Sequence, residues 1–161
     1  MMKTNVRRWP YLLIGSIVFL CVGVIYAWSI FAAILKTDFK SWTSADLATT
    51  FTIIMGMFCI GNFAAGFISK KLSARAILLA CGLLISAGYI GISMVQENTI
   101  WLLYLSYGVV GGFSVGLAYN AVVSAVTGWF PEKVGSVSGI LMMSFAFTAF
   151  TYRPIKFVSI V

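Results

Sequence analysis

The sequence predicts an all-α, polytopic membrane protein with about five transmembrane helices, organised as a single domain over residues 1–161. Hydrophobic residues make up 61% of the chain and charged residues only 9%, whereas soluble domains contain about 25% charged residues. The uncharged stretches are continuous and have roughly the 20 residues with which a helix crosses a bilayer. Barrel strands would be shorter and would alternate in polarity. The predicted spans lie near residues 11–35, 47–68, 76–95, 100–126 and 134–150.

The first predicted span follows a basic N-terminus and extends over about 25 residues. The apolar core of a signal peptide has only about 7–15 residues, so we expect a retained helix. Tyr26 and Ser29 are three residues apart and share a helix face, and Trp28 lies beside them. Polar groups inside a bilayer face other helices or a water-filled cavity. This cluster is therefore a candidate for lining a cavity, and packing between helices is the alternative.

The gap between the second and third spans is basic and contains Lys70, Lys71 and Arg75. Basic residues also precede the first span and follow the fourth, whereas the gaps on the opposite side carry acidic residues, mixed with lysines or alone. This alternation is the positive-inside pattern. It predicts an integral, multi-pass protein of a bacterial plasma membrane with a cytoplasmic N-terminus. It also accounts for the net charge of +7 without a nucleic-acid partner.

In the fourth span, small and polar residues recur every four positions, which predicts close packing against another helix. The alternative is that this row lets helices slide or tilt during transport. Gly135 and Gly139 repeat the small-residue spacing at the start of the fifth span. Tyr119 and Asn120, in the inner part of the fourth span, are the second candidate for lining a cavity. The row consists of Tyr104, Gly108, Gly112, Gly116, Asn120 and Ser124.

The segment from Gly112 to Gly116 fits G-x-S-x-G, the nucleophile signature of serine hydrolases. A serine nucleophile needs a base, but the chain contains no histidine and the predicted spans contain no lysine. We therefore do not predict an enzyme. The three cysteines stand alone in separate spans, so neither a metal site nor a cofactor is predicted.

Two segments resemble the oxalate/formate antiporter family of the major facilitator superfamily. Residues 23–31, Gly-Val-Ile-Tyr-Ala-Trp-Ser-Ile-Phe, are similar to the family's first-helix signature. Residues 116–120, Gly-Leu-Ala-Tyr-Asn, followed by 129–135, Trp-Phe-Pro-Glu-Lys-Val-Gly, are similar to its fourth helix, inner loop and fifth-helix start. The likeness covers roughly residues 9–145.

The gap between the second and third spans resembles the superfamily's inner-loop motif, G-x-L-a-D-R-x-G-R-R, from Gly66 to Arg75. This likeness implies a gating role for Gly66, Lys70, Lys71 and Arg75. The sequence departs from the motif at Lys70, which stands where the motif has Asp.

The resemblance implies transport of small organic anions, such as oxalate and formate, by alternating access between two six-helix halves. Five spans would form an incomplete N-terminal half, expected to be truncated and unable to transport alone. Expected partners are the lipid bilayer, a small anionic substrate, and either a separate polypeptide with the further helices or another copy of the chain. The alternative is a small membrane assembly protein with a glycine-rich helix interface. The implied substrate-binding residues are Tyr26, Trp28, Ser29, Tyr119 and Asn120.

Overall fold

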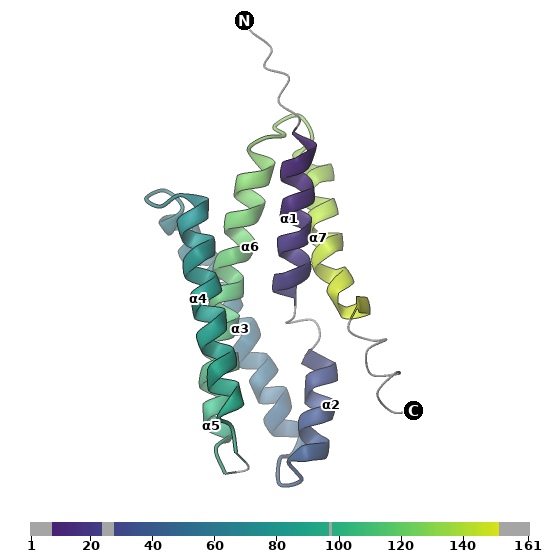
Figure 1. Cartoon of the computed structure of the whole chain (residues 1–161), viewed down its shortest axis with the longest axis vertical. Helices are drawn as coiled ribbons and strands as arrows, with labels where there is room; N and C mark the ends of the chain where they lie inside the picture. Colours follow the sequence, from purple (N-terminus) through teal and green to yellow (C-terminus); the bar gives the residue numbers. More distant parts are fainter. Residues whose placement is uncertain (1–7, 24–27, 97, 152–161) are drawn as a thin grey trace, which may run out of the picture.

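The computed structural model describes residues 8–23, 28–96 and 98–151, and these form helices joined by short turns, without a strand in those ranges. The all-α prediction is confirmed. Residues Ile100 to Thr127 form one long helix that has a π-helical segment, η2, near its start (Figure 1). The helices are α1 (Trp9–Val22), α2 (Trp28–Asp38), α3 (Ser44–Ile68), α4 (Ala74–Ser93), α5 (Ile100–Leu103), η2 (Tyr104–Gly111), α6 (Gly112–Thr127) and α7 (Val134–Thr151).

Among the described residues, three helices are long and apolar enough to cross a membrane, namely Ser44–Ile68, Ala74–Ser93 and Ile100–Thr127. They coincide with the second, third and fourth predicted spans to within three residues at each end. Two shorter apolar helices, Trp9–Val22 and Val134–Thr148, fall within or near the first and fifth. The structure describes the first predicted span as two helices, α1 and α2, with residues 24–27 outside the described part.

Polar caps fix where α3 and α4 begin. The Thr43 hydroxyl accepts a hydrogen bond from the Asp46 amide at 3.2 Å. In return, the Asp46 carboxylate accepts one from the Thr43 amide at 2.9 Å, which completes a capping box. The Ser73 hydroxyl caps α4 by accepting from the Ala76 amide at 3.4 Å. These side chains satisfy amides that have no partner in the first helical turn.

The long helix Ile100–Thr127 lies at the centre of the bundle. In its most apolar stretch 50% of the residues are buried, against 17% in α3 and in α4. Helices α3 and α4 pack against η2 and α6, whereas α1 packs against α6 and α7 (Figure 1). The outer faces carry many exposed Leu, Ile and Phe side chains. Such faces suit contact with lipid or with further helices in a membrane.

The glycine row of the fourth span lies against α3. A Cβ atom on Gly112 would come within 2.6 Å of the Ile54 carbonyl oxygen. On Gly116 it would come within 3.0 Å of the Asn62 amide nitrogen and 3.1 Å of the Gly61 Cα. The two backbones therefore touch, as in small-xxx-small packing. Because α3 covers these glycines, they are not available as an oligomer interface.

Gly135 and Gly139 do not take part in such a contact. A Cβ on either would meet no described atom within 4 Å. Both are exposed, because α7 turns its other side, with Val137 and Leu141, toward the core. The expectation that they extend the packing row is wrong for contacts within the described part of this chain.

A hydrogen bond joins α7 to the end of α1. The buried Thr148 hydroxyl donates to the Leu20 carbonyl at 3.1 Å. Leu20 lies in the last turn of α1, where carbonyls need partners outside the helix. Thr148→Val keeps the shape and should lower the free energy of unfolding by about 1–3 kcal/mol, the cost of a buried group that loses its partner.

Unfolding in mixed detergent and denaturing micelles, followed by circular dichroism, measures this loss. Ser144→Ala is the matched control, because the Ser144 hydroxyl donates only to the Ile140 carbonyl of its own helix. Equal losses in the two variants would show that the Thr148–Leu20 bond adds nothing between helices.

Candidate functional site

A groove of about 510 Å³ lies between α2 and α3. Its α2 wall is one helix face, because each lining residue has another lining residue three or four positions away. Pockets for small molecules measure about 300–1,000 Å³, so a small organic anion fits. Two predicted substrate-binding residues, Trp28 and Ser29, line it. The other lining residues are Ala32, Ala33 and Lys36 of α2 and Ser44, Leu47, Ala48 and Phe51 of α3.

Lys36 is the charged residue of this lining. Its Nζ donates a hydrogen bond to the Ser44 hydroxyl at 2.5 Å, which connects the end of α2 to the start of α3. An ammonium group has three donors, so further donors can serve a bound anion. Lys36 follows Ser29 by seven residues and Trp28 by eight, and this helical spacing places all three on one face.

Sequence reasoning missed Lys36 because the first predicted span ended at residue 35 and assigned the lysine to a loop. The helix continues to Asp38, so the lysine still belongs to the face that begins with Trp28. The spacing from Ser29 was the signal that could have found it.

Trp28 is buried and anchors the groove to the central helix. Its ring stacks on Tyr107 of η2, with centroids 5.2 Å apart and planes at 26°. Phe31 also contacts the Tyr107 ring, at 6.3 Å. The position of Trp28 therefore depends on the π-helical segment, a feature that often accompanies functional sites.

Tyr119 and Asn120 do not line the groove. The Tyr119 ring stacks on Phe19 of α1 at 5.2 Å and also contacts Phe58 of α3 and Phe145 of α7. The Asn120 side-chain oxygen accepts a hydrogen bond from the Ser124 hydroxyl at 3.2 Å.

Tyr119 is twelve residues from Tyr107, a separation of about 18 Å along an α-helix. Since Trp28 stacks on Tyr107, the two halves of the predicted site lie at different depths of the bundle. Tyr26 lies outside the described residues.

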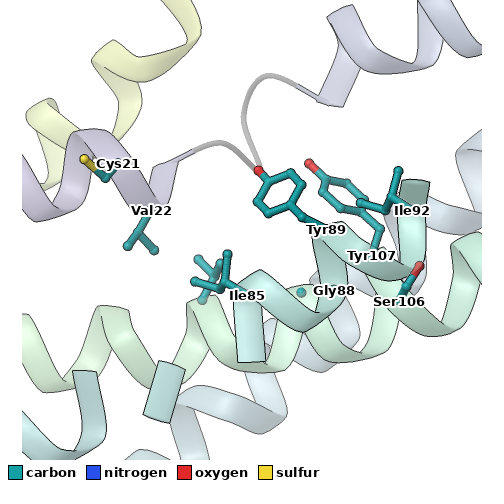
Figure 2. A pocket seen from close by; sticks show the side chains of 10 residues that line it. Cys21, Val22, Ile85, Gly88, Tyr89, Ile92, Ser106 and Tyr107 are labelled. Carbon is teal, nitrogen blue, oxygen red and sulfur yellow. The ribbon is translucent and has the colours of Figure 1, made fainter. Parts of the chain in front are cut away.

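A second, smaller cavity of about 50 Å³ is lined by α4, η2, the end of α1 and Val115 of α6 (Figure 2). Tyr89 and Tyr107 direct their hydroxyl groups to the same side of it, and Ser106 and Gly88 also line it. One water molecule occupies about 30 Å³ in the liquid. This cavity can hold a water molecule or two, whereas an organic anion needs the groove between α2 and α3.

The basic turn after α3 lies at the same end of the bundle as the start of α1 and the α6–α7 turn (Figure 1). Lys70, Lys71 and Arg75 are exposed, and within the described ranges none of them forms an ion pair. Gly66 is also exposed, and a Cβ there would meet nothing within 4 Å. The four residues implied by the inner-loop motif therefore form an open basic surface.

The G-x-S-x-G segment lies inside the packing between α3 and α6. Ser114 is fully buried, and its hydroxyl donates to the Val110 carbonyl of the same helix. Close packing thus accounts for this motif. Among the described residues no group of His, Cys, Asp and Glu could hold a metal ion.

Comparison with known proteins agrees with this architecture. A profile of the Major Facilitator Superfamily matches residues 7–155. The chain is 26% identical over 155 residues to the MFS-type transporter YhjX of Escherichia coli (strain K12), covering 95% of this chain and 38% of that protein. It is 26% identical over 132 residues to apicoplast pyruvate carrier 1 of Toxoplasma gondii, covering 82% and 23%.

A third relative, monocarboxylate transporter 1 of Mus musculus, is 24% identical over 148 residues, covering 89% of this chain and 29% of the transporter. The chain thus spans less than two fifths of the length of these relatives. The profile match extends over nearly all of the sequence and includes every described helix. This chain therefore belongs to the Major Facilitator Superfamily.

Proposed function

We propose that this chain is part of a carrier for small carboxylates and that the groove between α2 and α3 contacts the anion. Membership of a transporter superfamily supports transport as the activity. Two relatives are named as a pyruvate carrier and a monocarboxylate transporter, which supports carboxylates as the substrate class. The groove with Lys36 is the observation that carries the proposal.

The groove offers chemistry that matches a small carboxylate. The Lys36 ammonium can donate to a carboxylate oxygen, and such charge-assisted bonds are about twice as strong as neutral ones. The buried Trp28 ring provides an apolar wall for the planar part of the anion. In this proposal the groove forms one wall of a translocation pathway that alternates in access between the two sides of the membrane.

Oxalate and formate, the substrates implied by the first-helix resemblance, remain proposals within this class. A single lysine in the groove balances one negative charge, which favours formate and pyruvate. The oxalate dianion would have one carboxylate without a cation among the lining residues of the groove.

Binding and uptake can be measured separately. The purified chain in lipid nanodiscs is titrated with radiolabelled formate, pyruvate and oxalate, and uptake is measured in liposomes that contain the chain. Saturable binding of the monocarboxylates, competed by unlabelled anion but not by a neutral amide of the same size, is the expected result. Equal binding of the amide would exclude the groove as a carboxylate site.

We also propose that the N-terminus is cytoplasmic, in the plasma membrane of a bacterium. The support is that the start of α1, the α3–α4 turn and the α6–α7 turn lie at one end of the bundle, whereas the α2–α3 turn lies at the other (Figure 1). The first three carry Arg8, Lys70, Lys71 and Lys133, and the last is flanked by Asp38 and Asp46. Positive loops remain on the cytoplasmic side.

Cysteine labelling tests this orientation. In a background without the native cysteines, Ser69→Cys should react with a membrane-impermeant maleimide only after permeabilisation of the cells. Ser41→Cys, an equally exposed serine at the opposite end, should react in intact cells. The reverse pattern would invert the proposed orientation.

A further inference from the structure

An exposed aromatic strip follows the outer face of α3 toward its C-terminal end. Phe63 and Phe67 are four residues apart and are 73% and 59% exposed. Their rings meet edge to face with centroids 5.0 Å apart. In the part of the chain that the structure describes, α6 and η2 pack on another side of α3 and leave this strip uncovered.

Basic side chains continue this strip beyond the end of the helix. Lys70 follows Phe67 by three residues, and its Nζ lies 5.9 Å from the Phe67 ring centroid. Lys71 and Arg75 are exposed nearby. No acidic residue occurs between Asp46 and Glu97 in the sequence, so no neighbouring carboxylate in this segment balances the three cations.

The distances along the helix match the layers of a bilayer leaflet. Phe63 lies five residues before the end of α3 at Ile68, and Lys70 follows two residues later in the turn, so they lie on the order of 10 Å apart along the helix axis. A lipid has its charged phosphate about that far from the upper part of its acyl chains. Leu72, at the tip of the turn, is 52% exposed and adds an apolar contact between the basic residues.

We propose that this face of α3, together with the α3–α4 turn, binds an anionic phospholipid. The phosphate contacts Lys70, Lys71 and Arg75, and one acyl chain lies along Phe63 and Phe67. Charge complementarity selects an anionic over a zwitterionic headgroup, because each lysine or arginine near the surface attracts anionic lipid. A whole lipid should bind more tightly than a free phosphate ester, because only the lipid has an acyl chain that can contact the aromatic strip.

Native mass spectrometry of the purified, delipidated chain tests this site. Dioleoyl phosphatidylglycerol and dioleoyl phosphatidylcholine are titrated separately, and the first bound lipid is quantified. Phosphatidylglycerol should bind at least fivefold more tightly than phosphatidylcholine. The variant K70Q/K71Q should lose about 25-fold in phosphatidylglycerol affinity, which is about fivefold for each cation removed.

Matched control variants test whether lipid affinity depends on the basic turn and on the aromatic strip. K40Q removes one exposed lysine at the opposite end of the bundle and should leave the affinity unchanged, whereas K70Q alone should lose about fivefold. F63A/F67A should weaken binding, whereas L79A/L83A should not, although Leu79 and Leu83 form an equally exposed pair on α4. Circular dichroism confirms that each variant remains helical.

Several outcomes would overturn the proposal. Equal affinity for the two lipids would remove the headgroup selectivity. Equal losses in K70Q and K40Q would make the effect one of total charge. Displacement of the lipid by an equal concentration of glycerol 3-phosphate would show a phosphate site without a lipid site. Unchanged binding in F63A/F67A would leave the strip to another occupant, such as a further helix.

Discussion

Lys36→Gln should weaken binding of pyruvate or formate by about 10- to 150-fold. A hydrogen bond to a charged group contributes about 1.5–3 kcal/mol, and Lys36 is the cation that faces the groove. Glutamine keeps a donor at similar reach but loses the charge. The measurement is equilibrium binding of the labelled anion to the chain in nanodiscs, at constant ionic strength because surface electrostatics depend on salt.

Lys40→Gln is the control for this substitution. Lys40 is exposed in the turn between α2 and α3, and it does not line the groove. Its loss should change the affinity by less than a factor of about two, as expected for a screened surface charge. Lys36→Arg should restore most of the binding. If the two glutamine variants behave alike, Lys36 attracts anions only as part of the general surface charge.

Gly116→Ala should lower the free energy of unfolding by about 1–3 kcal/mol, the usual cost of overpacking. The added Cβ would lie 3.0 Å from the Asn62 amide nitrogen and 3.1 Å from the Gly61 Cα. Both are backbone atoms of α3, so relief requires the whole helix to move. Unfolding in mixed micelles, followed by circular dichroism, measures the loss.

Gly139→Ala separates this clash from the general effect of replacing a helical glycine. A Cβ at Gly139 meets nothing within 4 Å, and alanine favours a helix by about 0.5–1 kcal/mol over glycine. The control should therefore be neutral or stabilising, opposite in sign to Gly116→Ala. The close contact between α3 and α6 would be refuted by equal stability of the two variants.

The sequence predicted the second, third and fourth helices to within three residues at each end. Apolar runs set the lengths, and polar residues mark the boundaries. The Thr43–Asp46 capping box extends α3 to Ser44, three residues before the predicted start, because a cap can begin a helix outside the apolar run. In the same way Ser73 starts α4 at Ala74.

In the first and fourth spans, hydropathy did not predict where the helices end or which residues form a π-helix. The apolar run 11–35 is described as α1 and α2, and α2 continues past its end through Lys36 to Asp38. In the fourth span, residues 104–111 form a π-helix. Apolar content is identical for α- and π-helical bonding, so no feature of the pattern distinguished them.

The sequence predicted two residues of the groove, but it did not show which other aromatic residues face a cavity. Trp28 and Ser29 line the groove because they share one face of α2. Tyr119 appeared equally suitable by residue type, but its ring lies among Phe19, Phe58 and Phe145. Which aromatic residues face a cavity depends on contacts between α1, α3 and α7. Those contacts are long-range and leave no local signal in the sequence.

The π-helical segment is also the part of the long helix that can lose a residue without disturbing the packing beyond it. Bonds from residue i to i+5 give wider turns than those of an α-helix, so the eight residues from Tyr104 to Gly111 hold surplus backbone. Losing one residue there can convert a wide turn to an ordinary one while Gly112 and Gly116 stay against α3. A deletion between Gly112 and Gly116 instead rotates everything beyond it by about 100° and turns Gly116 away from α3. Deletion of a single residue should therefore leave the fold intact between Tyr104 and Gly111 and should destabilise it elsewhere in the helix.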